Sequence, residues 1–92
     1  MKDHVSLPFS MDWTKEEIVK VVNFFTQVDD AYDKGTRAGT ILKAYEEFKE
    51  VVPAKNEEKT YFRDYERQTN QSCWQTVQQA RKVNEDELVR RP

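Results

Sequence analysis

Two carboxylates fall where helical periodicity places apolar side chains, and they are the first candidates for chemistry. Asp29 lies inside the apolar arc of one predicted helix, and Glu58 lies inside that of another. Because an unpaired buried charge is costly, each must find a partner or lie at the boundary of the core. One interpretation is a pair that faces a single cleft as general acid and base or binds a cation. The interpretation we favour is two structural hydrogen bonds that fix how the helices pack.

The single cysteine and the single histidine offer little for nucleophilic or metal chemistry. Cys73 falls at the first position of a predicted helix, where the helix dipole can lower the pKa of a thiol. It also shares the arc of apolar residues, so we expect a small buried side chain rather than a redox or nucleophilic site. His4 lies in an N-terminal segment without helical period. One cysteine and one histidine cannot build a disulfide or a zinc site, so no disulfide, metal or cofactor is predicted.

Two charge clusters remain. Asp29, Asp30 and Asp33 crowd the C-terminal end of a predicted helix, but they lack the spacing and the glycine of a calcium loop, so we expect a solvated helix end. A second cluster steps by four residues along another predicted helix, opposite its apolar arc, where solvated charges belong. This basic stripe consists of Lys55, Lys59, Arg63 and Arg67.

The composition excludes several classes of protein. The chain has 92 residues, 17 acidic and 15 basic side chains and a formal charge of −2, which fits one domain. A protein built to neutralise a phosphate backbone is usually strongly basic, so nucleic acid is not the expected partner. No apolar run approaches the roughly 18 residues of a membrane span, and no signal peptide pattern is present. We therefore expect a cytoplasmic protein that does not engage a membrane.

Helical periodicity predicts the elements that must position these side chains. Thr14 and Glu17 form a capping box that begins a helix, which Gly35 ends. A second helix is expected from near Thr36 to before Pro53, and a third from about 54 to 68. A second capping box begins a fourth helix at 73, with Trp74, Val77 and Ala80 turned inward. Short connections between four helices predict an all-α compact bundle or array.

Both ends of the chain differ from this pattern. Before the first helix, apolar residues alternate at Val5, Leu7, Phe9, Met11 and Trp13. Period two predicts an extended arm with one apolar face, which lies across the helices or, alternatively, pairs with or swaps into another chain. After Val83 the chain turns charged, as in a frayed helical end or a tail. The predicted organisation is a single domain with an arm (1–13), a helical core (14–83) and a charged tail (84–92).

Several runs of residues resemble one known family. They are DWTKEEI (12–18), VVNF (21–24), AYDKG (31–35), AYEEFKEVVP (44–53) and EEK (57–59). Together they are similar to the small cytosolic proteins of low-GC Gram-positive bacteria called uncharacterised protein family 0223. The resemblance implies a multihelical fold. Because the function of the family is not established, it implies no catalytic residue, ligand or partner.

The leading hypothesis is a non-enzymatic domain that acts through protein contacts, with an unknown protein partner or as a homodimer. The candidate contact surface combines the apolar face of the arm with two residues at the margins of the helical arcs, of which Phe24 is expected to be half exposed. Its residues are Leu7, Phe9, Met11, Trp13, Phe24 and Leu42. The alternative is a nucleic-acid-associated adaptor that uses the basic stripe, and a small enzyme that uses Asp29 and Glu58 ranks last.

Overall fold

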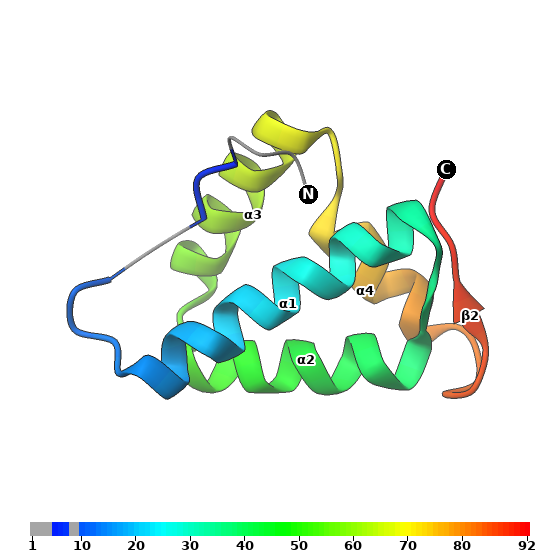
Figure 1. The fold of residues 1–92 in the computed structure, drawn as a ribbon, viewed down its shortest axis with the longest axis horizontal. Helices are drawn as coiled ribbons and strands as arrows, with labels where there is room; N and C mark the ends of the chain where they lie inside the picture. Colours follow the sequence, from blue (N-terminus) through cyan, green and yellow to red (C-terminus); the bar gives the residue numbers. More distant parts are fainter. Residues whose placement is uncertain (1–4, 8–9) are drawn as a thin grey trace.

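The computed structural model describes residues 5–7 and 10–92, and over that part of the chain it shows four helices and a two-stranded sheet (Figure 1). The elements are α1 (Lys15–Asp33), β1 (Thr36–Arg37), α2 (Ala38–Val51), α3 (Lys55–Thr69), α4 (Cys73–Arg81) and β2 (Leu88–Val89). The prediction of an all-α multihelical array is confirmed. Within this part of the chain, no helix is both apolar enough and long enough to span a membrane.

The expected signals set the ends of α1. The Thr14 hydroxyl accepts a hydrogen bond from the backbone N–H of Glu17 (3.1 Å), and the Glu17 carboxylate accepts one from the N–H of Thr14 (2.8 Å). This is the predicted capping box. At the other end Gly35 has φ +94°, a left-handed conformation that side chains disfavour. The chain can therefore reverse direction within a few residues and return as α2, antiparallel to α1 (Figure 1).

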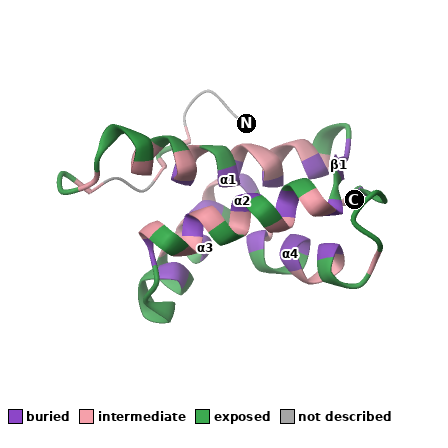
Figure 2. Cartoon of the chain, turned by 90° about the horizontal axis from the view of Figure 1, so that it is seen from below, coloured by how far each residue is buried: buried purple, intermediate pink, exposed green. Residues whose placement is uncertain are grey.

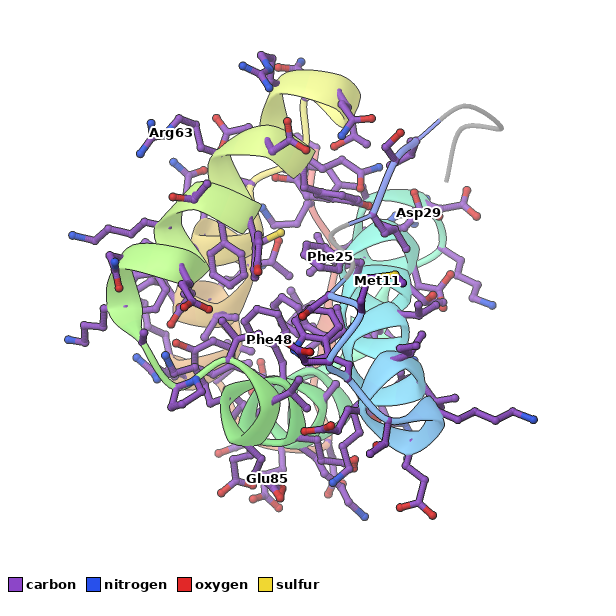
Figure 3. The ribbon with its side chains drawn as sticks, turned by 90° about the vertical axis from the view of Figure 1, so that its left-hand side faces the viewer. Met11, Phe25, Asp29, Phe48, Arg63 and Glu85 are labelled. Carbon is purple, nitrogen blue, oxygen red and sulfur yellow. The ribbon has the colours of Figure 1, made fainter. Side chains whose placement is uncertain are left out.

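Aromatic side chains from three helices form the centre of the core. The Phe24 ring stacks on Phe48 and on Phe62, with centroids 5.1 Å and 5.5 Å apart. Phe25 contacts Tyr65 at 4.8 Å. Through these ring contacts α3 packs against the α1–α2 pair. Figure 3 shows Phe25 and Phe48 pointing into the space between the helices. Buried positions recur along one side of each helix, as amphipathic periodicity requires (Figure 2).

Three expectations about these helices are corrected. Phe24 is fully buried rather than half exposed, because α2 and α3 both cover the margin of the α1 arc. Trp74 was expected inside, yet 43 % of its surface is exposed, because it lies on the flank of α4 against Tyr45. Finally, α2 begins at Ala38 rather than near Thr36, because residues 36–37 form β1.

The C-terminal segment is neither a frayed helix nor a free tail. Its strand β2 pairs antiparallel with β1, with Thr36 opposite Val89. Val89 is completely buried, and the backbone N–H of Arg91 donates to the carbonyl of Ala31 (2.8 Å). The guanidinium of Arg91 also donates to Gln79 and Gln75. The turn between α1 and α2 leaves unpaired backbone groups, and this segment satisfies them.

The described part of the N-terminal arm lies across the helices, as expected. Ser6 exchanges two hydrogen bonds with the amide of Gln68 in α3, at 2.8 Å and 2.9 Å. Its neighbours Val5 and Leu7 pack against the core. Trp13 makes an edge contact with Tyr61, with centroids 6.2 Å apart. Of the arm residues singled out above, His4 and Phe9 lie outside the described residues.

Candidate functional site

A pocket of about 490 Å³ opens between α2, α3 and α4. Its lining combines aromatic side chains with long charged ones from all three helices. The lining residues are Tyr45, Lys49, Lys55, Glu58, Lys59, Phe62, Arg63 and Trp74. A pocket of this size falls within the usual range for sites that hold a small molecule or a partner side chain.

Helical spacing explains why these residues face the same space. The five lining residues of α3 occupy positions i, i+3, i+4, i+7 and i+8, which form one face of a helix. From α2, Tyr45 and Lys49 are four residues apart and so are neighbours on its surface. The connection at residues 52–54 turns the chain so that this face of α3 looks toward α2 and α4.

Glu58 is the buried polar group of the pocket, and two partners satisfy it. Its carboxylate accepts a hydrogen bond from the Tyr45 hydroxyl (2.7 Å) and another from the Lys49 ammonium (2.5 Å). Lys49 also donates to the carbonyl of Pro53 (3.2 Å). Burial, together with the hydrogen bond to Glu58, raises the pKa of Tyr45 well above its ordinary value. Glu58 therefore has the structural hydrogen bonds that we favoured for it.

The basic stripe divides into two parts at the pocket. Lys55, Lys59 and Arg63 are exposed along its rim, and no carboxylate of the described residues lies within ion-pair distance of them. Arg63 projects outward from α3 in Figure 3. Arg67 instead pairs with Asp64, one turn away on the same helix. Within the part of the chain that the structure describes, the rim thus carries three cations that form no ion pair.

The opposite wall of the pocket is aromatic. Trp74 meets Tyr45 edge to face, with centroids 6.4 Å apart. The guanidinium carbon of Arg81 lies 5.6 Å from the centroid of the Tyr45 ring and 5.4 Å from that of Trp74, so one cation covers both rings. Phe62 connects this wall to the core. The pocket is therefore apolar inside and positively charged around its mouth.

Asp29 does not share this pocket. It lies on α1 and accepts a hydrogen bond from the Gln71 amide (3.0 Å), which in turn accepts one from the Tyr65 hydroxyl (2.8 Å). Burial alone would raise the pKa of Asp29, but hydrogen bonding, including that from Gln71, holds it below the ordinary value. The structure thus places the two carboxylates in separate environments and does not join them in one cleft. Among the described residues, no acidic, histidine or cysteine cluster could hold a metal ion.

Cys73 is buried, as expected, with 1 % of its surface exposed. Burial, with a smaller contribution from the charge of Glu66, raises the pKa of its thiol well above the ordinary value. This is the opposite of the shift that a nucleophilic or redox-active thiol needs.

The predicted contact residues differ in how far they are exposed. Leu7, Trp13 and Leu42 are half-buried and pack against the core, while Met11 is fully exposed. Tyr45, Lys49 and Trp74 were not predicted to line a pocket. Two features of the sequence could have indicated this site: the spacing of four residues between Tyr45 and Lys49, and the basic stripe. Nothing in the sequence showed that α3 faces α2.

Comparison with known proteins gives a family and no activity. The model of an uncharacterised protein family, UPF0223, matches residues 4–89. A UPF0223 protein of Staphylococcus aureus (strain bovine RF122 / ET3-1) is 39 % identical over 83 residues, which cover 90 % of this chain and 91 % of the relative. Another, from strain N315, is 39 % identical over 82 residues, which cover 89 % and 90 %. The chain therefore belongs to the UPF0223 family, as its runs of residues suggested.

Proposed function

We propose that the chain is a non-enzymatic protein-interaction domain that acts in the cytoplasm, and that its pocket receives an apolar side chain of a partner protein. The observation that carries the proposal is the pocket between α2, α3 and α4, whose interior is aromatic and open to solvent. Trp74 is 43 % exposed at its edge. Exposed aromatic residues beside cationic ones are typical of protein interfaces.

The hydrogen bonds of the pocket support binding rather than catalysis. Lys49 and Tyr45 each donate a hydrogen bond to the Glu58 carboxylate. With its raised pKa, Tyr45 stays protonated at neutral pH and cannot serve as a base. Cys73 is buried and does not line the pocket. Glu58, Lys49 and Tyr45 are thus engaged in hydrogen bonds that hold the fold together.

A nucleic-acid-associated adaptor is the second candidate, because the rim cations and the exposed Trp74 are also the ingredients of a single-strand binding surface. Two features count against it. Arg67, the last member of the basic stripe, pairs with Asp64, and Glu66 lies beside it on the helix. The chain as a whole carries a charge of −2.

Photo-crosslinking in living cells tests the proposal. A photoreactive phenylalanine at position 59, on the pocket rim, should form a discrete adduct with a partner protein. The matched control places the same group at Val19, which is 60 % exposed on α1 and does not line the pocket. Adding Trp74→Ala should abolish the adduct at position 59, because it removes the exposed edge of the binding wall.

The adduct also distinguishes the partners. An adduct of twice the chain mass identifies a second copy, which is the homodimer hypothesis. An adduct with RNA supports the adaptor instead. Equal labelling from positions 59 and 19, or an adduct that Trp74→Ala leaves unchanged, contradicts the proposed role of the pocket.

A further inference from the structure

The pocket combines an aromatic interior with a positively charged rim, and these two features together indicate what it binds. We infer that it binds an acidic segment of a partner protein in which an aromatic side chain is flanked by carboxylates. This inference rests on the proposed function and adds to it the chemical class of the bound segment. The argument depends on the charge around the mouth, the shape of the interior and the spacing of the cations.

The charge of the mouth favours an anion. Four of the eight lining residues are cationic and one is a carboxylate. That carboxylate, Glu58, is neutralised internally by Lys49, while Lys55, Lys59 and Arg63 have no ion-pair partner among the described residues. Arg81 lies outside the pocket lining and adds a further cation over the Tyr45 and Trp74 rings. A protein with an overall charge of −2 thus carries a local excess of positive charge at this opening.

The interior favours an aromatic side chain. Tyr45 lies 6.5 Å from Phe62 and 6.4 Å from Trp74, measured between ring centroids, and Phe62 continues to Phe48 at 5.5 Å. A row of rings therefore runs from the core to the surface and ends at the open edge of Trp74. An incoming aromatic ring can extend this row with the tilted or edge-to-face geometry that its members already use.

The spacing of the rim cations fits an extended peptide. Lys55, Lys59 and Arg63 succeed one another by one helical turn, or about 6 Å along the axis of α3. In an extended chain, side chains on the same face recur every two residues, or about 6.6 Å. Acidic residues at alternate positions of a bound segment therefore meet successive cations. The unpaired part of the basic stripe ends at Arg63, because the next cation, Arg67, pairs with Asp64, and this short track favours a peptide over a polynucleotide.

Titration with short synthetic peptides tests the inference. The probes are an extended acidic peptide with a central phenylalanine, Ac-GEDEFEDEG-amide, its alanine analogue Ac-GEDEAEDEG-amide and its lysine analogue Ac-GKKKFKKKG-amide. An oligothymidine is the fourth probe. Binding to the full chain is followed by nuclear magnetic resonance through the indole N–H of Trp74. We expect the acidic phenylalanine peptide to bind, the alanine analogue to bind roughly tenfold more weakly, and the lysine analogue and the oligothymidine not to bind.

Two variants test whether the rim cations are responsible for peptide binding. Arg63→Glu should weaken binding of the acidic phenylalanine peptide by about tenfold or more, because it replaces an attraction by a repulsion. Lys15→Glu makes the same change of charge in the first turn of α1, away from the pocket, and should leave binding unchanged. Both positions are exposed, so both variants should fold. Binding should also weaken as salt is raised.

Distinct outcomes separate this inference from the proposed function. If position 59 forms a protein adduct in cells but the lysine analogue binds as well as the acidic peptide, the inference fails and the proposed function stands. Preferential binding of the oligothymidine overturns both in favour of the adaptor. If no peptide binds and no adduct forms, both are also wrong.

Discussion

Replacing Lys49 with methionine should destabilise the domain by about 2–3 kcal/mol. The substitution keeps most of the packing of the side-chain stem but removes the ammonium that donates to Glu58 at 2.5 Å and to Pro53 at 3.2 Å. The Glu58 side chain is only 8 % exposed, so its charge cannot turn to water. Breaking a fully buried pair costs about 3–5 kcal/mol. We expect less here because the Lys49 side chain is 25 % exposed and Tyr45 still donates to the carboxylate.

Urea unfolding followed by circular dichroism measures the effect. A domain of this size has a total stability of about 5–14 kcal/mol. For small domains the free energy of unfolding falls by at least about 1 kcal/mol for each molar of urea. At that slope the midpoint of Lys49→Met should lie about 2–3 M below that of the parent protein.

Two controls show whether the stranded carboxylate is the cause. The double variant Lys49→Met/Glu58→Gln removes the charge as well and should regain much of the lost stability, because a neutral amide costs less to bury. Lys20→Met breaks a surface pair with Glu50 (3.7 Å, side chains 37 % and 61 % exposed) and should cost less than about 0.5 kcal/mol. The reasoning is refuted if Lys49→Met is as stable as the parent protein, or if the double variant is no more stable than the single one.

Three further predictions follow from buried or strained groups. Native Cys73 should react with a thiol reagent only after unfolding, because it is 1 % exposed and burial raises its pKa; equal rates with and without urea would contradict this. Gly35→Ala should cost about 1–2 kcal/mol, because the residue has φ +94° and a Cβ atom would come within 2.9 Å of Leu88; an unchanged melting temperature would argue against that contact. Burial raises the pKa of Tyr45 and of Tyr65, so the folded state favours their protonated forms. The stability that these two side chains contribute is therefore complete below the ordinary tyrosine pKa of 10.0 and is lost as the pH rises above it. An ultraviolet titration in which all four tyrosines ionise near that value with the fold intact would disprove the assignment.

Local signals in the sequence predicted the helices well. The capping box at Thr14, the left-handed glycine at position 35 and the apolar arcs depend on residues within a turn or two of one another, so they can be read without tertiary structure. The strand β2 could not be predicted in this way. Its partner lies more than fifty residues away, and a two-residue strand has too short an alternation to detect.

The site was predicted only in its parts. Helical phase placed Glu58 inside the apolar arc, where the structure buries it, and placed the cations opposite that arc. The cations are exposed, but Lys55, Lys59 and Arg63 share the pocket-lining face of α3 with Glu58 and Phe62. Whether the two faces meet at one opening depends on the angle between α3 and α2, which the connection at residues 52–54 sets. The exposure of Trp74 could not be predicted for the same reason. Whether a residue at the flank of a short helix is buried depends on which other helix packs against it.

The pairing of β1 with β2 has a consequence for how the protein is made. A ribosome synthesises residues 88–89 after all four helices, yet these residues cover the turn between the first two. Besides the strand pairing, the N–H groups of Ala38 and Gly39 at the start of α2 donate to the carbonyls of Glu87 and Glu85. A polypeptide that stops short of Glu85 leaves this helix start and strand edge without their partners. A larger fraction of it should therefore be unfolded and open to cellular proteases. The fold can therefore be completed only after residues 85–89 have been synthesised, and shortened copies of the chain should not accumulate.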